Sequence, residues 1–108
     1  MAKFLIVESR DLMEYRDGEF ALELASQLKK KGHDATLFLV ENAALAARKG
    51  SEASSKLTAL SREGVEVLAE DLSLQIRGVS DRVEGVSESN METLAELILN
   101  GVDKVLWY

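Results

Sequence analysis

The chain of 108 residues contains no cysteine and no proline, and it has a single histidine. Without cysteine it cannot form a disulfide bond, a thiolate nucleophile or a thiolate metal site. Because no proline, repeat or linker marks a boundary, residues 1–108 are expected to form one domain. A domain of this size supports one hydrophobic core and gains much stability from association, so we expect an oligomer.

The chain also lacks an excess of basic residues and any long apolar run. Nineteen acidic residues against thirteen basic ones give a formal charge of −6, which disfavours direct binding to nucleic acid. No apolar run approaches the roughly 20 residues of a membrane-spanning helix, and the amino terminus carries no cleavable signal pattern. We therefore expect a cytoplasmic protein that binds no membrane.

Short apolar runs indicate four strands. The first two runs are continuously apolar, which is typical of strands covered on both faces of a parallel sheet. The predicted strands comprise residues 4–7, 37–40, 65–68 and 105–107.

Helical spacing of apolar residues, together with start and stop signals, indicates five helical segments between these strands. The segment at residues 78–88 is rich in glycine, serine and charge, and it is predicted to be a surface loop. Four of the expected helices comprise residues 20–28, 43–47, 54–63 and 72–76. The fifth begins at an S-x-x-E capping box at 89–92 and ends at Gly101.

Strands that alternate with helices predict the α/β class, here a three-layer α/β/α sandwich with a mainly parallel sheet and right-handed crossovers. In such sheets functional groups gather at the carboxyl ends of the strands. Ser9, Arg10 and the loop 78–88 belong to this edge. The candidate ligand-binding residues there are Glu8, Glu41, Asn42, Glu70 and Asp71.

Seven segments carry a family resemblance through their order and spacing. They include MAKFLIV at 1–7 and GHDATLFLV at 32–40, followed by 41–43, 46–50, 64–69, 77–79 and 101–108. In this pattern the chain resembles the DsrE/DsrF-like family of small sulfur-relay proteins, which includes the Tus subunits of tRNA thiolation. The resemblance implies a DsrE/F-like fold.

The resemblance also implies where sulfur would be held. In members that carry sulfur, the acceptor cysteine follows the third strand, several residues before an Arg-Gly pair similar to Arg77-Gly78. Counting along the chain places this position at or next to Glu70. A carboxylate cannot form a persulfide, because that chemistry requires a polarizable thiolate. Cysteine-dependent sulfur transfer by this chain alone is thus excluded, and we predict no catalytic residue, no cofactor and no metal site.

Two functional hypotheses from different classes remain. The first is a non-catalytic subunit for protein–protein assembly in a sulfur-relay system, which carries no persulfide itself and forms a homo-oligomer or a hetero-oligomer with related subunits. The second is a small-molecule or anion-binding protein, an enzyme included, that uses the carboxyl edge of the sheet. In a third hypothesis, a partner's cysteine at a shared interface restores sulfur transfer, and this would require a mixed oligomer.

Structural alternatives accompany these candidates. Glu70 and Asp71 can hold a divalent cation or move a proton, but adjacent carboxylates before a short helix also fit an N-terminal cap. Arg48 and Lys49 suit an anion, although such side chains are mostly solvated.

The remaining candidates lie toward the ends of the expected sheet. His33 is expected at its amino edge, opposite the site. Trp107 and Tyr108 fit either an interface anchor or the closure of the core.

Overall fold

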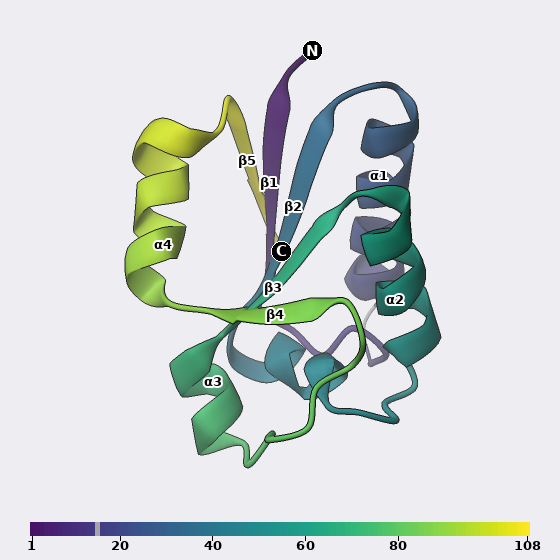
Figure 1. The fold of residues 1–108 in the computed structure, drawn as a ribbon, viewed down its shortest axis with the longest axis vertical. Coiled ribbons are helices and arrows are strands. Elements are labelled where there is room, and N and C mark those ends of the chain that lie inside the picture. The colour runs from purple at the N-terminus through teal and green to yellow at the C-terminus, as the bar shows by residue number, and fades with distance from the viewer. Residues whose placement is uncertain (15) are drawn as a thin grey trace.

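The computed structural model describes residues 1–14 and 16–108, with the backbone alone at residues 16 and 17. Helices and strands alternate along the chain (Figure 1). The strands are β1 (Lys3–Glu8), β2 (Asp34–Leu39), β3 (Glu66–Glu70), β4 (Val86–Ser89) and β5 (Lys104–Trp107). The helices are α1 (Arg16–Lys30), the 3₁₀ helix η1 (Glu41–Ala47), α2 (Ser54–Glu63), α3 (Asp71–Ile76), α4 (Met91–Glu96) and its π-helical continuation η2 (Leu97–Gly101).

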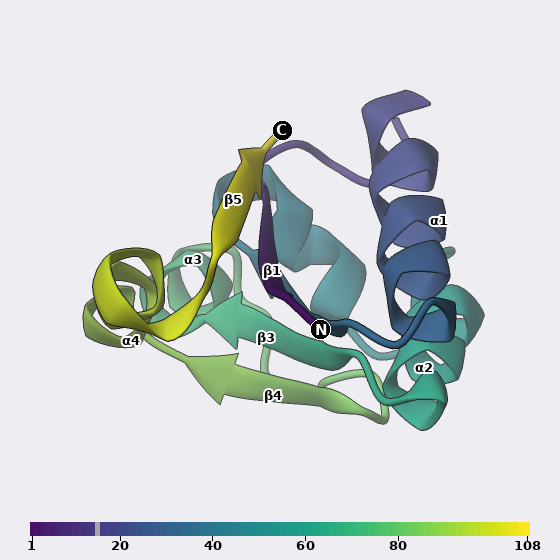
Figure 2. The ribbon, with the colours of Figure 1, turned by 90° about the horizontal axis from the view of Figure 1, so that it is seen from above.

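All five strands are parallel, in the order β4-β3-β2-β1-β5. Helices α1 and α2 cover one face of the sheet and α4 covers the other, as the view from above shows (Figure 2). The predicted three-layer α/β/α sandwich is therefore confirmed. Within the described residues, no helix has both the length and the apolar composition that crossing a membrane requires.

Side-chain alternation divides the core into two clusters. On the α1 and α2 face, Ile6 and Leu37 pack in a large cluster with helix residues such as Leu57. On the opposite face, Leu5 and Phe38 are buried in a smaller cluster that also contains Leu94, Val7, Val40 and Leu68. Because successive strand residues point to opposite faces, strands buried on both sides read as continuous apolar runs.

The prediction of a loop over 78–88 was wrong in its last three residues, which belong to β4. Val86 pairs with Val67 of β3 and is buried, whereas Ser87 and Glu88 are exposed. A four-residue edge strand with a single buried apolar position has too short a pattern to distinguish it from a loop.

The start of the last helix was also predicted one residue early. Asn90, not Ser89, is the cap, because its side-chain oxygen accepts a hydrogen bond from the backbone N–H of Thr93. Ser89 is the last residue of β4 and pairs with Glu70. Asparagine and serine cap helices equally well, so strand pairing decides between them here.

Candidate functional site

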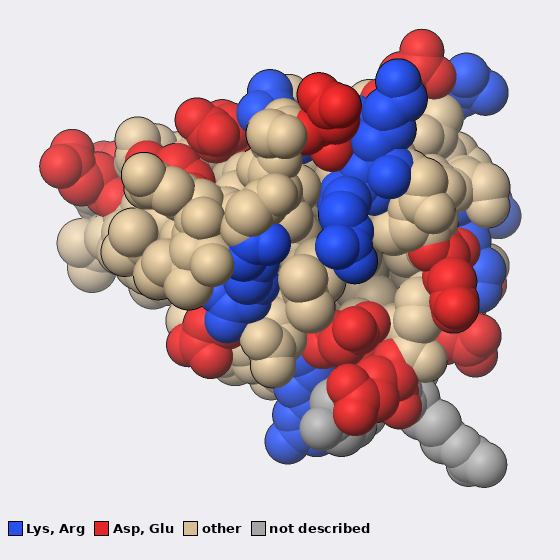
Figure 3. Space-filling model, turned by 90° about the horizontal axis from the view of Figure 1, so that it is seen from below, with Lys and Arg blue, Asp and Glu red and all other residues tan. Residues whose placement is uncertain are grey.

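The carboxyl edge of the sheet brings the ends of β1, β2 and β3 together, as predicted from parallel topology. Figure 3 views the molecule from this end and shows acidic and basic side chains interspersed over the surface. Glu8 and Glu70 end their strands inside the protein, with exposed fractions of 0% and 6%. Glu41, Asn42 and Asp71 are exposed.

Glu70 is the N-cap of α3. Its Oε1 accepts a hydrogen bond from the backbone N–H of Ser73 at 3.2 Å and a second one from the Ser73 hydroxyl. The Ser73 Oγ in turn accepts a hydrogen bond from the backbone N–H of Glu41 at 2.8 Å. Glu41 has a φ of +50°, in the left-handed region that residues other than glycine rarely adopt. The Glu70–Ser73 pair therefore holds a strained turn at the end of β2.

Arg77 ties a second part of the same edge together. Its Nε and Nη2 donate to the Asn42 Oδ1 at 3.2 and 3.0 Å, and its Nη1 donates to the backbone carbonyl of Ser73 at 3.2 Å. The guanidinium thus links the start of η1 to the end of α3. Three predicted site residues, Glu41, Asn42 and Glu70, are joined in this way into one hydrogen-bonded network.

The two residues that join this network were not among the predicted site residues. Ser73 stands three positions after Glu70, the spacing at which a capping side chain meets the N3 residue of a helix, so a signal for it was present in the sequence. Arg77 entered only through the Arg-Gly resemblance. Its bond to Asn42 spans 35 positions of the chain, and no local pattern indicates such a contact.

Glu8 and Asp71 lie outside the network. Strand alternation places the Glu8 side chain on the Ile6 face of the sheet and the Glu70 side chain on the Leu68 face. Asp71 uses its Oδ1 to accept a hydrogen bond from the backbone N–H of Leu72. Among the side chains that the structure describes, those of residues 1–14 and 18–108, no group of three or more His, Cys, Asp or Glu is arranged to hold a metal ion.

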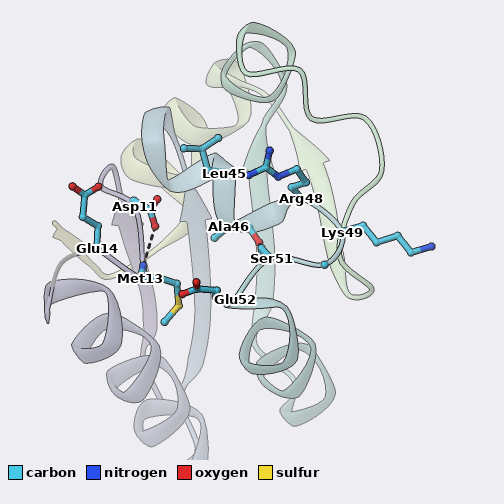
Figure 4. A pocket seen from close by; sticks show the side chains of 10 residues that line it. Asp11, Met13, Glu14, Leu45, Ala46, Arg48, Lys49, Ser51 and Glu52 are labelled. Carbon is cyan, nitrogen blue, oxygen red and sulfur yellow. Dashed lines mark hydrogen bonds between the residues drawn. The ribbon is translucent and has the colours of Figure 1, made fainter.

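A cavity of about 480 Å³ lies beside this edge, between the segment after β1 and the segment that joins η1 to α2 (Figure 4). Arg48 and Lys49, which suit either an anion or a solvated surface, both line it, but the Lys49 side chain points away from its centre. The cavity is lined by Asp11, Met13, Glu14, Leu45, Ala46, Arg48, Lys49, Gly50, Ser51 and Glu52.

Hydrogen bonds order both walls of the cavity. The Asp11 Oδ1 accepts from the backbone N–H of Met13 at 2.9 Å, and the Ser51 hydroxyl donates to the carbonyl of Ala46 at 2.7 Å. None of the five predicted ligand-binding residues lines this space.

His33 and the terminal aromatic residues take different places. The His33 Nδ1 accepts a hydrogen bond from the backbone N–H of Ala2 at 2.9 Å, and its ring meets Phe4 edge to face at 5.4 Å. His33 therefore lies at the amino edge, as expected. Tyr108 packs against the larger core cluster, whereas Trp107 is 57% exposed.

These features define a small three-layer α/β domain in which a buried carboxylate ends the third strand. The model of the DsrE/DsrF-like family matches residues 2–108, and the chain belongs to this family. No curated protein sequence matches the chain.

Solved structures are similar along the whole chain. The YchN protein from E. coli has 25% sequence identity and a TM-score of 0.92, with 100% of both chains covered. MTH1491 from Methanobacterium thermoautotrophicum has 18% identity and a TM-score of 0.78, with 100% of both chains covered. BT1422 from Bacteroides thetaiotaomicron has 19% identity and a TM-score of 0.79, with 99% of this chain and 95% of that chain covered. The last two likenesses concern the fold alone.

Proposed function

We propose that the chain is a non-catalytic DsrE/F-like subunit that acts through protein–protein assembly in a sulfur-relay system and carries no persulfide itself. One observation supports this above all. Glu70, at or next to the position that the family resemblance assigns to the acceptor cysteine, is buried and caps α3 through Ser73.

The neighbouring polar groups are bonded to one another in the same way. Asn42 and Arg77 share two hydrogen bonds, and the Ser73 hydroxyl joins Glu70 to the backbone of Glu41. A persulfide carrier needs a thiolate that its donor and acceptor can reach, because each attacks at sulfur. At the end of β3 this chain instead has a carboxylate with a structural role, which is compatible with a subunit that supports the activity of another.

A reconstituted sulfur-transfer assay tests this proposal. Extract from host cells that lack the chain is supplied with a labelled persulfide donor, with or without the purified protein. We expect the added protein to raise transfer of label to the final acceptor while gaining no label itself. An equal amount of heat-unfolded protein is the control. Label retained on the chain, or transfer that does not change on addition, would contradict the proposal.

The cavity near Arg48 favours a second candidate function, the binding of a small anion. Arg48 lines this cavity, and so do the acidic residues Asp11, Glu14 and Glu52. A guanidinium binds carboxylate or phosphate groups through paired hydrogen bonds. The nearby carboxylates restrict the fit to ligands that also carry a donor or a positive charge, as an amino acid does.

Thermal unfolding tests this second candidate. A free amino acid present at about 100 times its Kd should stabilise the protein by about 2.7 kcal/mol. The Arg48→Ala variant should lose that gain, whereas Arg62→Ala, which removes a guanidinium from the exposed ion pair with Glu84, should keep it. If no amino acid or simple anion raises the Tm of the wild-type protein, the cavity is not a binding site for this class of ligand.

A further inference from the structure

The two edges of the sheet differ in the side chains that they present. At the β4 edge Ser87 and Glu88 are exposed, and polar and charged residues of this kind discourage edge-to-edge pairing. At the β5 edge Val105 and Trp107 are 37% and 57% exposed. Lys104 is the only charged residue in β5, and it stands at the start of the strand. The β5 edge thus lacks most of the protection that the β4 edge has.

Exposed apolar side chains continue from β5 onto α4. Val105 and Trp107 pair with Leu5 and Val7, so they lie on the sheet face that α4 covers. Figure 2 shows β5 at the edge of the sheet and α4 on one side of it. The α4–β5 surface comprises Met91, Ile98, Val105 and Trp107, each between 37% and 57% exposed.

Helix geometry makes this surface continuous. Leu94 and Leu97 point from the helix into the core. Met91 and Ile98 stand seven positions apart, on the flank next to these two leucines, and the right-handed turn of α4 sets that flank toward β5. Together the four side chains leave roughly 300–400 Å² exposed, a size that marks interaction sites on soluble proteins.

The backbone of β5 indicates what kind of partner fits. Tyr108 exchanges hydrogen bonds with β1, since its N–H donates to Val7 at 2.8 Å and its carbonyl accepts from Ser9 at 2.9 Å. Successive residues of a strand direct their backbone groups to opposite sides, so those of Trp107 and Val105 face the open edge. Another strand satisfies these groups best.

We propose that a second copy of this chain covers the surface, with the two β5 strands paired antiparallel about a two-fold axis at Leu106. In this register Val105 of each copy stands opposite Trp107 of the other, and an aromatic side chain beside a β-branched one is a favourable cross-strand pair. Both residues direct their backbone groups outward, so four hydrogen bonds form and one sheet runs through both copies.

The register is self-complementary, as a two-fold interface requires. The α4–β5 surface supplies somewhat less than half of the roughly 800 Å² that each partner contributes to a stable interface, and the strand backbones and the rim can supply the remainder. This inference rests on the proposed assembly role, and it names the surface and the partner for that role.

A cysteine introduced at Leu106 tests the register, because the chain has no cysteine of its own. Opposed residues of a non-hydrogen-bonded antiparallel pair have Cα atoms about 4.5 Å apart, within the range of disulfides. Under mild oxidation Leu106→Cys should give a covalent dimer. Ile76→Cys, at a site that is 70% exposed on α3, should not.

A second variant tests the surface without relying on a disulfide. Trp107→Glu should raise the dimer dissociation constant at least about thirtyfold, because it removes a central aromatic residue and places two carboxylates near the axis. Leu72→Glu, an exposed site on α3, should leave the constant unchanged. Light scattering across concentrations measures the constants, and circular dichroism checks that each variant is folded.

The outcomes separate this inference from the proposed function. If the wild-type protein is oligomeric but Leu106→Cys does not crosslink and Trp107→Glu still associates, the interface lies elsewhere and the assembly role stands. A purified wild-type protein that stays monomeric at every concentration also overturns the inference, and the assembly role is then decided by the sulfur-transfer assay and by the partners that the protein retains when isolated from its host.

Discussion

Replacing Glu70 by alanine is expected to lower the free energy of unfolding by about 2–4 kcal/mol. The substitution removes the N-cap of α3, the acceptor of the Ser73 N–H, which costs about 1 kcal/mol. It also leaves the buried Ser73 hydroxyl without its acceptor, which costs about 1–3 kcal/mol. The hydroxyl also holds the left-handed turn at Glu41, so the end of β2 should loosen as well. Urea unfolding at a fixed protein concentration measures the loss, because association would otherwise change it.

Two further variants define what this result means. Glu70→Gln keeps an acceptor oxygen at the cap and should lose much less stability than the alanine variant. Asp71→Ala removes an exposed carboxylate from the adjacent position and should lose less than about 1 kcal/mol. If Glu70→Ala were as stable as the wild type, the carboxylate would not be a structural cap, and the case for a ligand at this position would be restored.

The Gly18→Ala substitution should cost at least about 2 kcal/mol, because overpacking a rigid contact is destabilising. A Cβ atom at Gly18 would stand 2.1 Å from the carbonyl oxygen and 2.5 Å from the Cα of Leu12. The obstacle is backbone, so no side-chain rotation relieves it. The gain in helix propensity from glycine to alanine, about 1 kcal/mol, offsets only part of the cost.

Gly18 also contacts the segment that forms one wall of the cavity beside the carboxyl edge. Leu12 is fully buried and stands between Asp11 and Met13, which both line the cavity. Displacement of Leu12 should therefore disturb the cavity wall as well as the stability. Thermal unfolding measures the effect, and Glu19→Ala, at the next and exposed position of α1, is the matched control. An unchanged Tm for Gly18→Ala would show that the chain before α1 is not packed against the helix.

The parts of the fold that could be predicted depend on strong local patterns. Strands β1 and β2 are covered on both faces, so their apolar runs are continuous and easy to recognise. Helix α2 was predicted with its observed bounds, because Gly64 marks its end with a left-handed φ of +101°.

The parts that could not be predicted depend on contacts between distant residues. Strand β4 has one buried apolar residue, and its identity as a strand comes from pairing with β3. Parallel topology correctly brought Glu41, Asn42 and Glu70 to one edge. That their polar groups are tied together by Ser73 and Arg77 follows from geometry that the sequence pattern does not contain.

The sequence left two roles open for the terminal aromatic residues, and the structure separates them. Tyr108 packs on the core and bonds to β1 through its backbone, whereas Trp107 remains largely exposed on the α4 side. Alternation along a strand makes this division physically necessary, because adjacent residues cannot both face the same cluster. The exposed residue is the one that the proposed interface uses.

The most direct test of the assembly role is native mass spectrometry of the protein isolated gently from its own host. One spectrum reports the mass of the oligomer, a retained protein partner and a bound small molecule. We expect an oligomer with no added ligand mass, and a mixed complex with a cysteine-bearing relative would place the chain in a sulfur relay. A monomer, or an oligomer that carries a defined small molecule and no related subunit, would contradict the account and favour the binding function instead.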